Sequence, residues 1–494
     1  MVVKLKPRFT YLITIWIYWW TRLRNLDELP IFLDEAAHIW WARLVWEWQP
    51  FHAASDGRLF NVIWASMFWP FNGSVWISRG ATVLITTIGF SAILAFAQRF
   101  HSKEAGIIAG FIYILVPYAL FFERMQLPDP YAATFTMLLL WSSAQLAVAP
   151  HQNKFKLLVG LTLAAGMVSK ITYLIFLPIP IIAGLTLGHS YRIYHRSTQL
   201  KAALHSYMIG VLLLLPVVAI LKFVGHSDMG LDLLLKKTSN DVSEMLSQIR
   251  YSTPIVWRYF TTLFTPWLWW PGLLAIVIAI WQKTRLSAYI AITTLIGLLS
   301  LIAKSNPGFL EARFALPHVP HLIVLMSIGI ASIWLKLRSW NSNIKAIVLT
   351  ISLIFTYPSA QFMWTAWTEP DKLVLPGRDQ WEYITGWPSG YGFRDIAYYY
   401  DNNNKDTTLL TLDLGGQQRL AAYLAPDSSV TPLWKPPDKF MLDLSDTATT
   451  DKLLIVDIPK DNGAIDALGL NLLPVLEYSR PGDLSKLIVT KIVQ

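Results

Sequence analysis

Residues 30–48, which follow the first hydrophobic segment of the chain, read PIFLDEAAHIWWARLVWEW. Two adjacent carboxylates, Asp34 and Glu35, stand near the start of this stretch. If the preceding segment spans a bilayer, both lie at the membrane rim, where an ionised group requires water, a cation or a substrate beside it. What this pair faces depends on the topology of the rest of the chain.

The composition is typical of an integral membrane protein. Of the 494 residues, 54% are hydrophobic and only 15% are charged, whereas soluble proteins have about 25% charged residues. Tryptophans gather at the ends of apolar segments, as in an interfacial aromatic belt. The net charge of +9 is explained by basic loops on one side of a membrane, so no nucleic acid partner is expected.

The chain contains no cysteine, which excludes disulfides, thiolate metal sites and a cysteine nucleophile. Its basic N-terminal residues precede an apolar run without a small-residue cleavage site. We therefore expect an uncleaved first membrane span.

Eleven segments are candidates for membrane helices, which need about 20 mainly apolar residues each. They lie at residues 9–21, 79–98, 105–122, 131–149, 157–169, 171–188, 203–222, 259–281, 286–303, 315–335 and 345–361. Residues 157–188 allow either one span or two short ones that meet at Lys170. Two segments are preferred, because with a cytoplasmic N-terminus every basic loop then lies inside.

The same topology predicts which loops lie outside, and these loops carry nearly all of the acidic residues. They are residues 22–78, 123–130, 223–258 and 304–314, and everything after about Gln361. We predict a multi-pass protein of the plasma membrane, with the active site and the C-terminal domain extracytoplasmic.

The tail changes character and divides the chain into two predicted domains. Residues 1–361 form the transmembrane domain, and residues 362–494 form a small α/β domain outside the membrane. Short β-rich runs lie at 407–412, 453–458 and 487–492, and helical patterns at 415–425 and 462–468 alternate with them.

The first outer loop contains a predicted amphipathic helix. Trp, Leu and Val recur at helical spacing over residues 34–48, opposite His38, Arg43 and Glu47, which fits a helix lying in the membrane interface. Asp34 could instead serve as a helix cap. A cap needs one acid only, so Glu35 remains available for another role.

The second and third outer loops also combine acids with bases. Glu123, Arg124 and Asp129 lie within seven positions of one another, and Asp129 between two prolines could instead be a helix cap. In the third loop, Lys304 and Arg313 lie beside span starts, where an Arg fork suits a phosphate. Ordinary interfacial snorkelling would also explain both bases.

These motifs together resemble the GT-C superfamily of polytopic glycosyltransferases, in its protein mannosyltransferase-like and lipid A aminoarabinose transferase-like branch. The matching features extend over residues 5–360. They are Asp34-Glu35, Glu123-Arg124 with Leu127-Pro128-Asp129-Pro130, Ser169-Lys170, and Glu311-Ala312-Arg313-Phe314 with Leu316-Pro317. The segment Gly386-Trp387-Pro388-Ser389-Gly390-Tyr391-Gly392 resembles a feature of bacterial members that have a periplasmic tail.

The resemblance implies sugar transfer from a polyprenyl-phosphate donor to a glycolipid, polysaccharide or protein acceptor. Asp34 is then the general base for the acceptor hydroxyl, with Glu35 and Asp129 in supporting catalytic roles. The expected phosphate ligands are Arg313, Arg124, Lys170 and Lys304. Glu123, His38 and His318 are expected to contact substrate.

The residues leave the cofactor and the class of protein open at two points. The resemblance implies that no metal is required, although Asp34, Glu35 and Asp129 together would suit Mg²⁺ or Mn²⁺. A transporter or flippase of lipid-linked sugars is disfavoured because the ionisable residues gather in outer loops rather than within spans. A glycan ligase, or a membrane scaffold with a sensor-like outer domain, would also be compatible with this topology.

Overall fold

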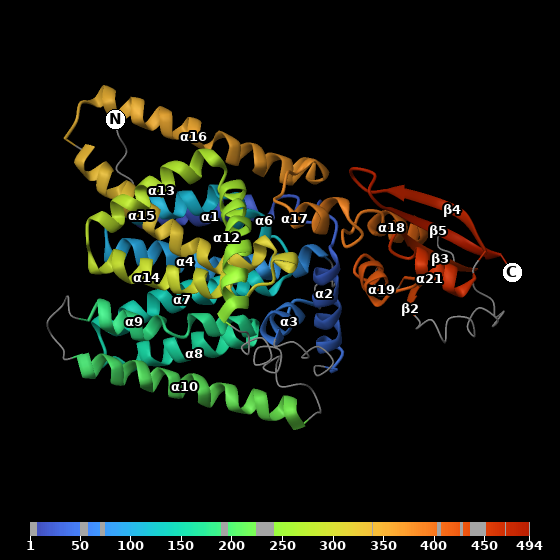
Figure 1. Ribbon diagram of the computed structural model, residues 1–494, viewed down its shortest axis with the longest axis horizontal. Coiled ribbons are helices and arrows are strands. Elements are labelled where there is room, and N and C mark those ends of the chain that lie inside the picture. Colours follow the sequence, from blue (N-terminus) through green and yellow to red (C-terminus); the bar gives the residue numbers. More distant parts are fainter. Residues whose placement is uncertain are drawn as a thin grey trace. The chain divides into compact units, whose positions relative to one another are not determined.

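The computed structural model divides into two compact units, which are described separately below (Figure 1). The first comprises residues 1–24, 54–61 and 82–364, and the second comprises residues 25–53, 62–81 and 365–494. The residues that the structure describes are 7–49, 58–69, 75–188, 196–223, 242–337, 339–402, 407–424, 428–434, 451–469 and 471–493. The second unit thus includes parts of the first predicted outer loop, and the division at residue 361 stays a prediction.

The first unit is a bundle of helices. Its N-terminal part contains α1 (Pro7–Leu23), most of α4 (Val75–Phe100), α5 (Lys103–Leu115), α6 (Pro117–Phe122), α7 (Pro128–Val148), α8 (Asn153–Ser169), η3 (Ile171–Phe176), α9 (Ile179–Thr186) and α10 (Arg196–Phe223). Its C-terminal part contains α12 (Val242–Leu263), α13 (Pro266–Trp281), α14 (Arg285–Lys304), η4 (Pro307–Phe309), η5 (Ala312–His318), α15 (Val319–Leu337) and most of α16 (Ser342–Thr368). Within the bundle α8 packs between α7 and α10 (Figure 1).

Helix breaks occur where the local sequence requires them. Lys170 has an extended backbone between α8 and η3, so the helix breaks where the two predicted segments meet, while their crossing of the membrane as two spans stays a prediction. Helix α5 ends at Leu115 and α6 begins at Pro117, one residue further on, because proline has no N–H for the preceding turn. These breaks direct side chains at the helix ends toward neighbouring segments.

The eleven predicted segments all overlap helices, but fewer meet the criteria for a complete span. Six helices among the described residues are long and apolar enough to cross a membrane, or seven if one bent pair counts as a span. That pair is α12 and α13, which meet at 111°. The number eleven therefore stays a prediction.

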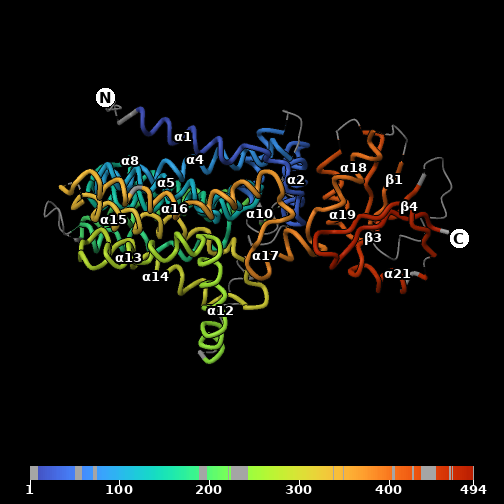
Figure 2. The backbone as a smooth tube through the Cα atoms, turned by 90° about the horizontal axis from the view of Figure 1, so that it is seen from above, coloured from blue at the N-terminus to red at the C-terminus, as the bar shows by residue number. Residues whose placement is uncertain are grey.

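The bend between α12 and α13 differs from the single span predicted at 259–281. Helix α12 begins at Val242, inside the predicted outer loop 223–258, and ends before Pro266. Figure 2 shows α12 projecting from the rest of the first unit. The apolar run continued across the break in sequence, so hydropathy did not reveal the change of direction.

The second unit contains a five-stranded sheet with strand order β2-β1-β3-β5-β4. The first three strands run parallel, and β5 is antiparallel to both β3 and β4. The strands are β1 (Thr407–Thr411), β2 (Val430–Trp434), β3 (Asp451–Ile458), β4 (Asn471–Ser479) and β5 (Lys486–Val493). The predicted strands correspond to β1, β3 and β5.

The two strands that were not predicted are the edge strands of the sheet. Strand β2 contains Pro432 and β4 contains Pro474, where the pairing register also shifts. A proline argues against a strand in a sequence, although edge strands tolerate it because one side of their backbone lacks a partner.

Helices cover both faces of the sheet, and further helices of the second unit come from the first predicted outer loop. Leu409 packs with Phe393 and Leu420 on one face, and Leu454 packs with Ile465 on the other. The remaining helices are α2 (Leu33–Trp46), part of α3 (Leu59–Ser66), η6 (Pro370–Lys372), α17 (Arg378–Gln380), η7 (Trp381–Thr385), α18 (Phe393–Asn402), α19 (Leu414–Ala421) and α21 (Asn462–Leu468).

Candidate functional site

Helix α2 is the helix predicted in the first outer loop, and Asp34 lies in its first turn. The helix begins at Leu33, so the N-cap position belongs to Phe32 rather than to Asp34. A carboxylate in the first turn is favoured by the helix dipole, and Asp34 is half-buried. Its side chain is therefore accessible while its backbone is held in the helix.

Glu35 lies in different surroundings, because it forms a buried ion pair with Arg79. The distances from Arg79 Nε to Glu35 Oε1 and from Arg79 Nη2 to Glu35 Oε2 are both 2.7 Å. Arg79 Nη1 also donates to the carbonyl oxygens of Leu26 and Leu29. This arginine, which was not singled out in the sequence, joins the start of α4 to the segment before α2. Its signal in the sequence was a lone base at the start of a predicted span.

The buried face of α2 differs from the apolar face that was predicted. Glu35, His38 and Ala42 are buried, whereas Trp46 is exposed. The ring of His38 packs edge-on against Trp41, with centroids 5.3 Å apart. The helix therefore packs through small and polar side chains together with the apolar side chain of Ile39.

In the first unit, Asp129 and Lys170 form an ion pair between two helix junctions. Asp129 lies in the first turn of α7 and follows the N-cap residue Leu127, so it does not occupy the cap position itself. Lys170 is the extended residue between α8 and η3, and its side chain is 14% exposed while that of Asp129 is 1% exposed. The break at Lys170 is what directs its ammonium to the α7 N-terminus.

Arg313 lies in the first turn of η5, and two tyrosines hold the backbone of this part of the connection between α14 and α15, which we name the Arg313 loop. Tyr118 donates a hydrogen bond of 2.6 Å to Ala312 O, and Tyr259 donates one to Leu310 O. Arg313 Nε lies 2.6 Å from Glu311 Oε2, and both side chains are 8% exposed. The short helix η5 also packs against α7. Arg313 is therefore held in position by three separate contacts around it.

Lys170 and Arg313 approach each other across one aromatic ring. The ring centroid of Phe314 lies 4.4 Å from Lys170 Nζ and 5.4 Å from Arg313 Cζ. Arg58 also lies within electrostatic range of Lys170, as do Arg313 and Asp129. Arg58 was missed in the sequence, although it is the only Lys or Arg between Arg43 and Arg79. We name Lys170, Arg313 and Arg58 the cation cluster.

Glu123 belongs to a separate buried network. Its carboxylate accepts hydrogen bonds from Arg22 Nε at 3.1 Å, from Tyr18 at 3.2 Å and from Tyr113 at 2.5 Å. Arg124 Nη1 lies 3.4 Å from Thr21 O. The observed contacts of Glu123 connect α1 to α5 and α6, so they are structural, and the predicted substrate contact stays a prediction.

Two further predicted residues lie apart from these contacts. Lys304 is exposed in the last turn of α14. His318 is fully buried at the end of η5, where its ring lies 5.1 Å from Phe176 and 6.5 Å from His321. Neither ring nitrogen of His318 has a hydrogen-bond partner among the described residues. A substrate contact for His318 stays a prediction.

The divalent cation that the sequence left open at Asp34, Glu35 and Asp129 stays a prediction, because Asp129 belongs to a different unit from the other two. Among the described residues, no group of three or more His, Cys, Asp or Glu side chains is arranged to hold a metal ion. Both oxygens of Glu35 bond to Arg79, and Asp129 is paired with Lys170.

The fold that these elements define is the GT-C fold, as the sequence predicted. ArnT from Cupriavidus metallidurans in the apo state aligns with a TM-score of 0.63 and 13% identity over 98% of this chain and 97% of that chain. A structure of ArnT bound to undecaprenyl phosphate aligns with a TM-score of 0.60.

A third similar structure is the archaeal oligosaccharyltransferase AglB from Archaeoglobus fulgidus, in complex with an inhibitory peptide and a dolichol-phosphate. It aligns with a TM-score of 0.58 and 13% identity over 94% of this chain and 71% of that chain. No family model and no curated protein sequence matches the chain. At these identities the likeness establishes the fold.

Proposed function

We propose that the chain is a membrane glycosyltransferase that moves a sugar from a polyprenyl-phosphate carrier to an acceptor on the extracytoplasmic side. The cation cluster of the first unit is the observation that carries this proposal. Two structures with the same fold support it, since ArnT was solved with undecaprenyl phosphate and AglB with a dolichol-phosphate. The donor leaves as a lipid phosphate, whose developing charge is stabilised by fixed cations.

In this proposal the cation cluster binds the donor phosphate. Arg313 offers a planar fork to two phosphate oxygens, and Lys170 and Arg58 add point charges beside it. Asp129 and Glu311 pair with Lys170 and Arg313, and so reduce the cost of holding these cations out of water. The three cationic side chains gather within electrostatic range of Lys170, which suits the binding of an anionic phosphate.

Asp34 is the proposed general base, in the second unit. The acceptor hydroxyl loses its proton as its oxygen attacks the anomeric carbon, and a carboxylate within hydrogen-bond reach accepts that proton. Its half-buried position suits this role better than that of its neighbour Glu35, whose oxygens are bonded to Arg79. The C–O bond to the phosphate breaks, and the phosphate carries the electron pair away.

The test is an assay of purified protein with a labelled polyprenyl-phosphate sugar and extracted envelope acceptors. Asp34→Asn is expected to lower kcat by about 10³-fold, whereas Glu47→Gln on the exposed end of α2 retains activity. Near-normal turnover by Asp34→Asn would remove Asp34 from this role. Arg313→Ala is expected to raise the apparent KM for the donor about tenfold, and Lys336→Ala serves as its control.

The same assay separates an enzyme from a transporter and from a ligase. Transfer of the label to an acceptor identifies an enzyme, whereas movement of the intact donor across a vesicle membrane identifies a transporter. Transfer from a lipid pyrophosphate glycan, without transfer from a lipid monophosphate sugar, identifies a ligase.

A further inference from the structure

The backbone immediately before Asp34 is held by a segment about 350 residues later in the chain, Gly386–Gly392. Leu33 N donates a hydrogen bond of 2.9 Å to Pro388 O. A Cβ on Gly390 would lie 2.0 Å from Ile31 O, so only glycine allows the two backbones to approach this closely. This is the Gly386-Trp387-Pro388-Ser389-Gly390-Tyr391-Gly392 segment noted in the sequence.

Helix α19 also packs against the start of α2. A Cβ on Gly415 would lie 2.1 Å from Leu33 Cδ1, and Ile31 N donates a hydrogen bond of 2.7 Å to Tyr423 Oη. The backbone N–H groups of Ile31 and Leu33, just before Asp34, are therefore both bonded to the C-terminal part of the chain.

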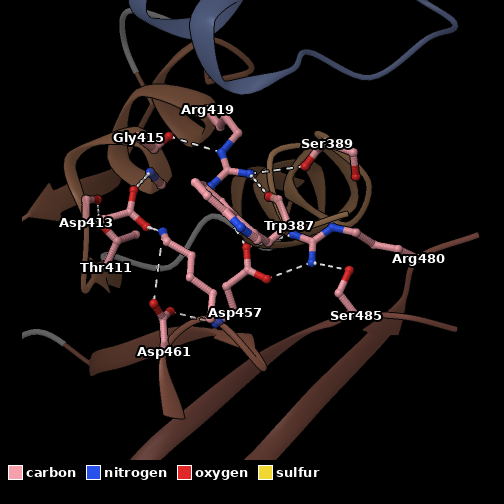
Figure 3. Close-up of polar contacts among 12 residues, drawn as sticks. Trp387, Ser389, Thr411, Asp413, Gly415, Arg419, Asp457, Asp461, Arg480 and Ser485 are labelled. Carbon is pink, nitrogen blue, oxygen red and sulfur yellow. Dashed lines mark hydrogen bonds and ion pairs between the residues drawn. The ribbon is translucent and has the colours of Figure 1, made fainter. Parts of the chain in front are cut away.

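Arg419, on α19, holds the Gly386–Gly392 segment in turn (Figure 3). Its Nη1 donates to Trp387 O at 2.7 Å and to Ser389 O at 3.1 Å, and its Cζ lies 4.0 Å from the ring centroid of Phe393. Lys460 Nζ lies 4.4 Å from the ring centroid of Trp387. Arg419 is fully buried, so its charge acts in surroundings of low dielectric constant.

A network of buried and half-buried charges supports Arg419 and Lys460, and the charges beside Arg419 are drawn in Figure 3. Arg480 binds both oxygens of Asp457 at 2.7 and 2.8 Å, and Arg419 Nη2 lies 3.9 Å from the same carboxylate. Lys460 pairs with Asp413. Burial lowers the pKa of Arg419 to about 10, with Asp457 and Asp413 opposing that effect, so Arg419 remains protonated at neutral pH.

The network lies where an open α/β sheet ordinarily binds a ligand. Strands β2 and β3 lie on opposite sides of β1, so the order in which the chain adds strands to the sheet reverses beside β1. Asp413 and Asp457 lie at the carboxyl ends of β1 and β3. Ligands of such sheets bind at this reversal point. Here Trp387 of the chain itself lies among these residues (Figure 3).

We propose that the sheet uses this position as a clamp on its own Gly386–Gly392 segment, and that Arg419 thereby positions Asp34 for proton transfer. Arg419 is a positioning residue that acts through the carbonyls of Trp387 and Ser389, and then through Pro388 and Gly390 on the start of α2. The kinetic part of this proposal rests on the proposed function of Asp34. The clamp itself does not.

The experiment compares Arg419→Gln and Gly390→Ala with Lys486→Gln, whose side chain forms an exposed ion pair with Glu477. Hydrogen exchange of the Ile31 and Leu33 amides is expected to be about tenfold faster in the first two variants and unchanged in the control. In the transfer assay, kcat is expected to fall about 10²-fold with the donor KM within twofold, because a displaced base affects the chemical step.

The outcomes are separable. Unchanged exchange at Ile31 and Leu33 in both variants overturns the clamp, and a raised donor KM with constant kcat overturns the positioning of Asp34. If Arg419→Gln fails to fold, Gly390→Ala still tests the contact directly, since it alters neither the network nor its charge. A wild-type protein without transfer activity contradicts the proposed function, while the exchange measurement still decides the clamp.

Discussion

Asp34 and Glu35 are adjacent, but the helix directs their side chains to different surroundings. Successive residues on an α-helix point about 100° apart. Glu35 therefore turns inward to Arg79, with both side chains 1% exposed, while Asp34 stays half-buried at the edge of α2. One carboxylate is structural and its neighbour stays accessible.

Glu35→Gln is expected to destabilise the protein by about 3–5 kcal/mol, because it leaves the Arg79 guanidinium buried without a countercharge. Thermal unfolding in detergent measures the loss. The double variant Glu35→Gln with Arg79→Met is expected to recover part of it, since the unpaired charge is gone. A Glu35→Gln protein as stable as the wild type would contradict this interpretation of the pair.

The carboxyl group of Asp461 makes the stability of the folded chain depend on pH. Burial raises its pKa to about 6 from the usual value near 4, although Asp457 N donates a hydrogen bond of 2.8 Å to it. Between these values the folded chain binds more protons than the unfolded chain, so this group makes stability fall as the pH rises from about 4 to about 6.

Asp461→Asn is therefore expected to raise the free energy of unfolding above pH 6 by about 1–2 kcal/mol, after allowance for solvent screening. The difference from the wild type is expected to vanish near pH 4, where both carry a neutral side chain. Unfolding midpoints measured at pH 4 and pH 8 check this. An equal difference at both pH values would assign the effect to packing.

At the scale of elements, helix breaks bring the charges of the first unit together. Lys170 reaches Asp129 because α8 ends one residue before it. Arg313 reaches Phe314 and Lys170 because the chain between α14 and α15 forms short 3-10 turns rather than one long helix. An uninterrupted helix would place these side chains along a stripe instead.

The hydroxyl of Tyr259 is expected to hold the Arg313 loop in place for donor binding. Tyr259→Phe removes the hydrogen bond to Leu310 O and leaves a buried carbonyl unsatisfied, at a cost of about 1–3 kcal/mol. We expect the donor KM to rise about threefold to tenfold, with kcat nearly unchanged. Tyr357→Phe on the exposed face of α16 is the matched control. An unaltered KM would show that the loop keeps its position without this bond.

At the scale of the whole molecule, the distribution of charge predicts its orientation in the membrane. The loops proposed to lie inside are basic and those proposed to lie outside carry the acids. The absence of native cysteines makes this prediction directly accessible, because any single introduced thiol is the only one in the chain.

Three asparagines serve as matched labelling positions, and all three are exposed. Asn306→Cys and Asn471→Cys are expected to react with a membrane-impermeant maleimide applied to intact cells, and Asn341→Cys only after permeabilisation. The extent of labelling on a gel measures this. Labelling of Asn341→Cys in intact cells would reverse the proposed topology.

Local hydropathy and periodicity were sufficient for the membrane class and three of the five strands, the charge of the loops along the chain indicated the break at Lys170, and short motifs added the GT-C fold. These features depend on residues close together in the chain, as in the alternation within β1. Edge strands β2 and β4 were not predicted, because tolerance of their prolines depends on a place in the sheet that only folding assigns.

The partners of the buried charges were decided by tertiary structure alone. Glu35 pairs with Arg79 at a separation of 44 positions, and Glu123 pairs with Arg22 at a separation of 101 positions. Neither arginine was singled out in the sequence. Packing of distant helices selects such partners, because a buried charge is stable only where the fold brings its complement within hydrogen-bond distance. The order of residues thus indicated which groups carry charge, and the fold decided which of them hold the structure and which remain accessible.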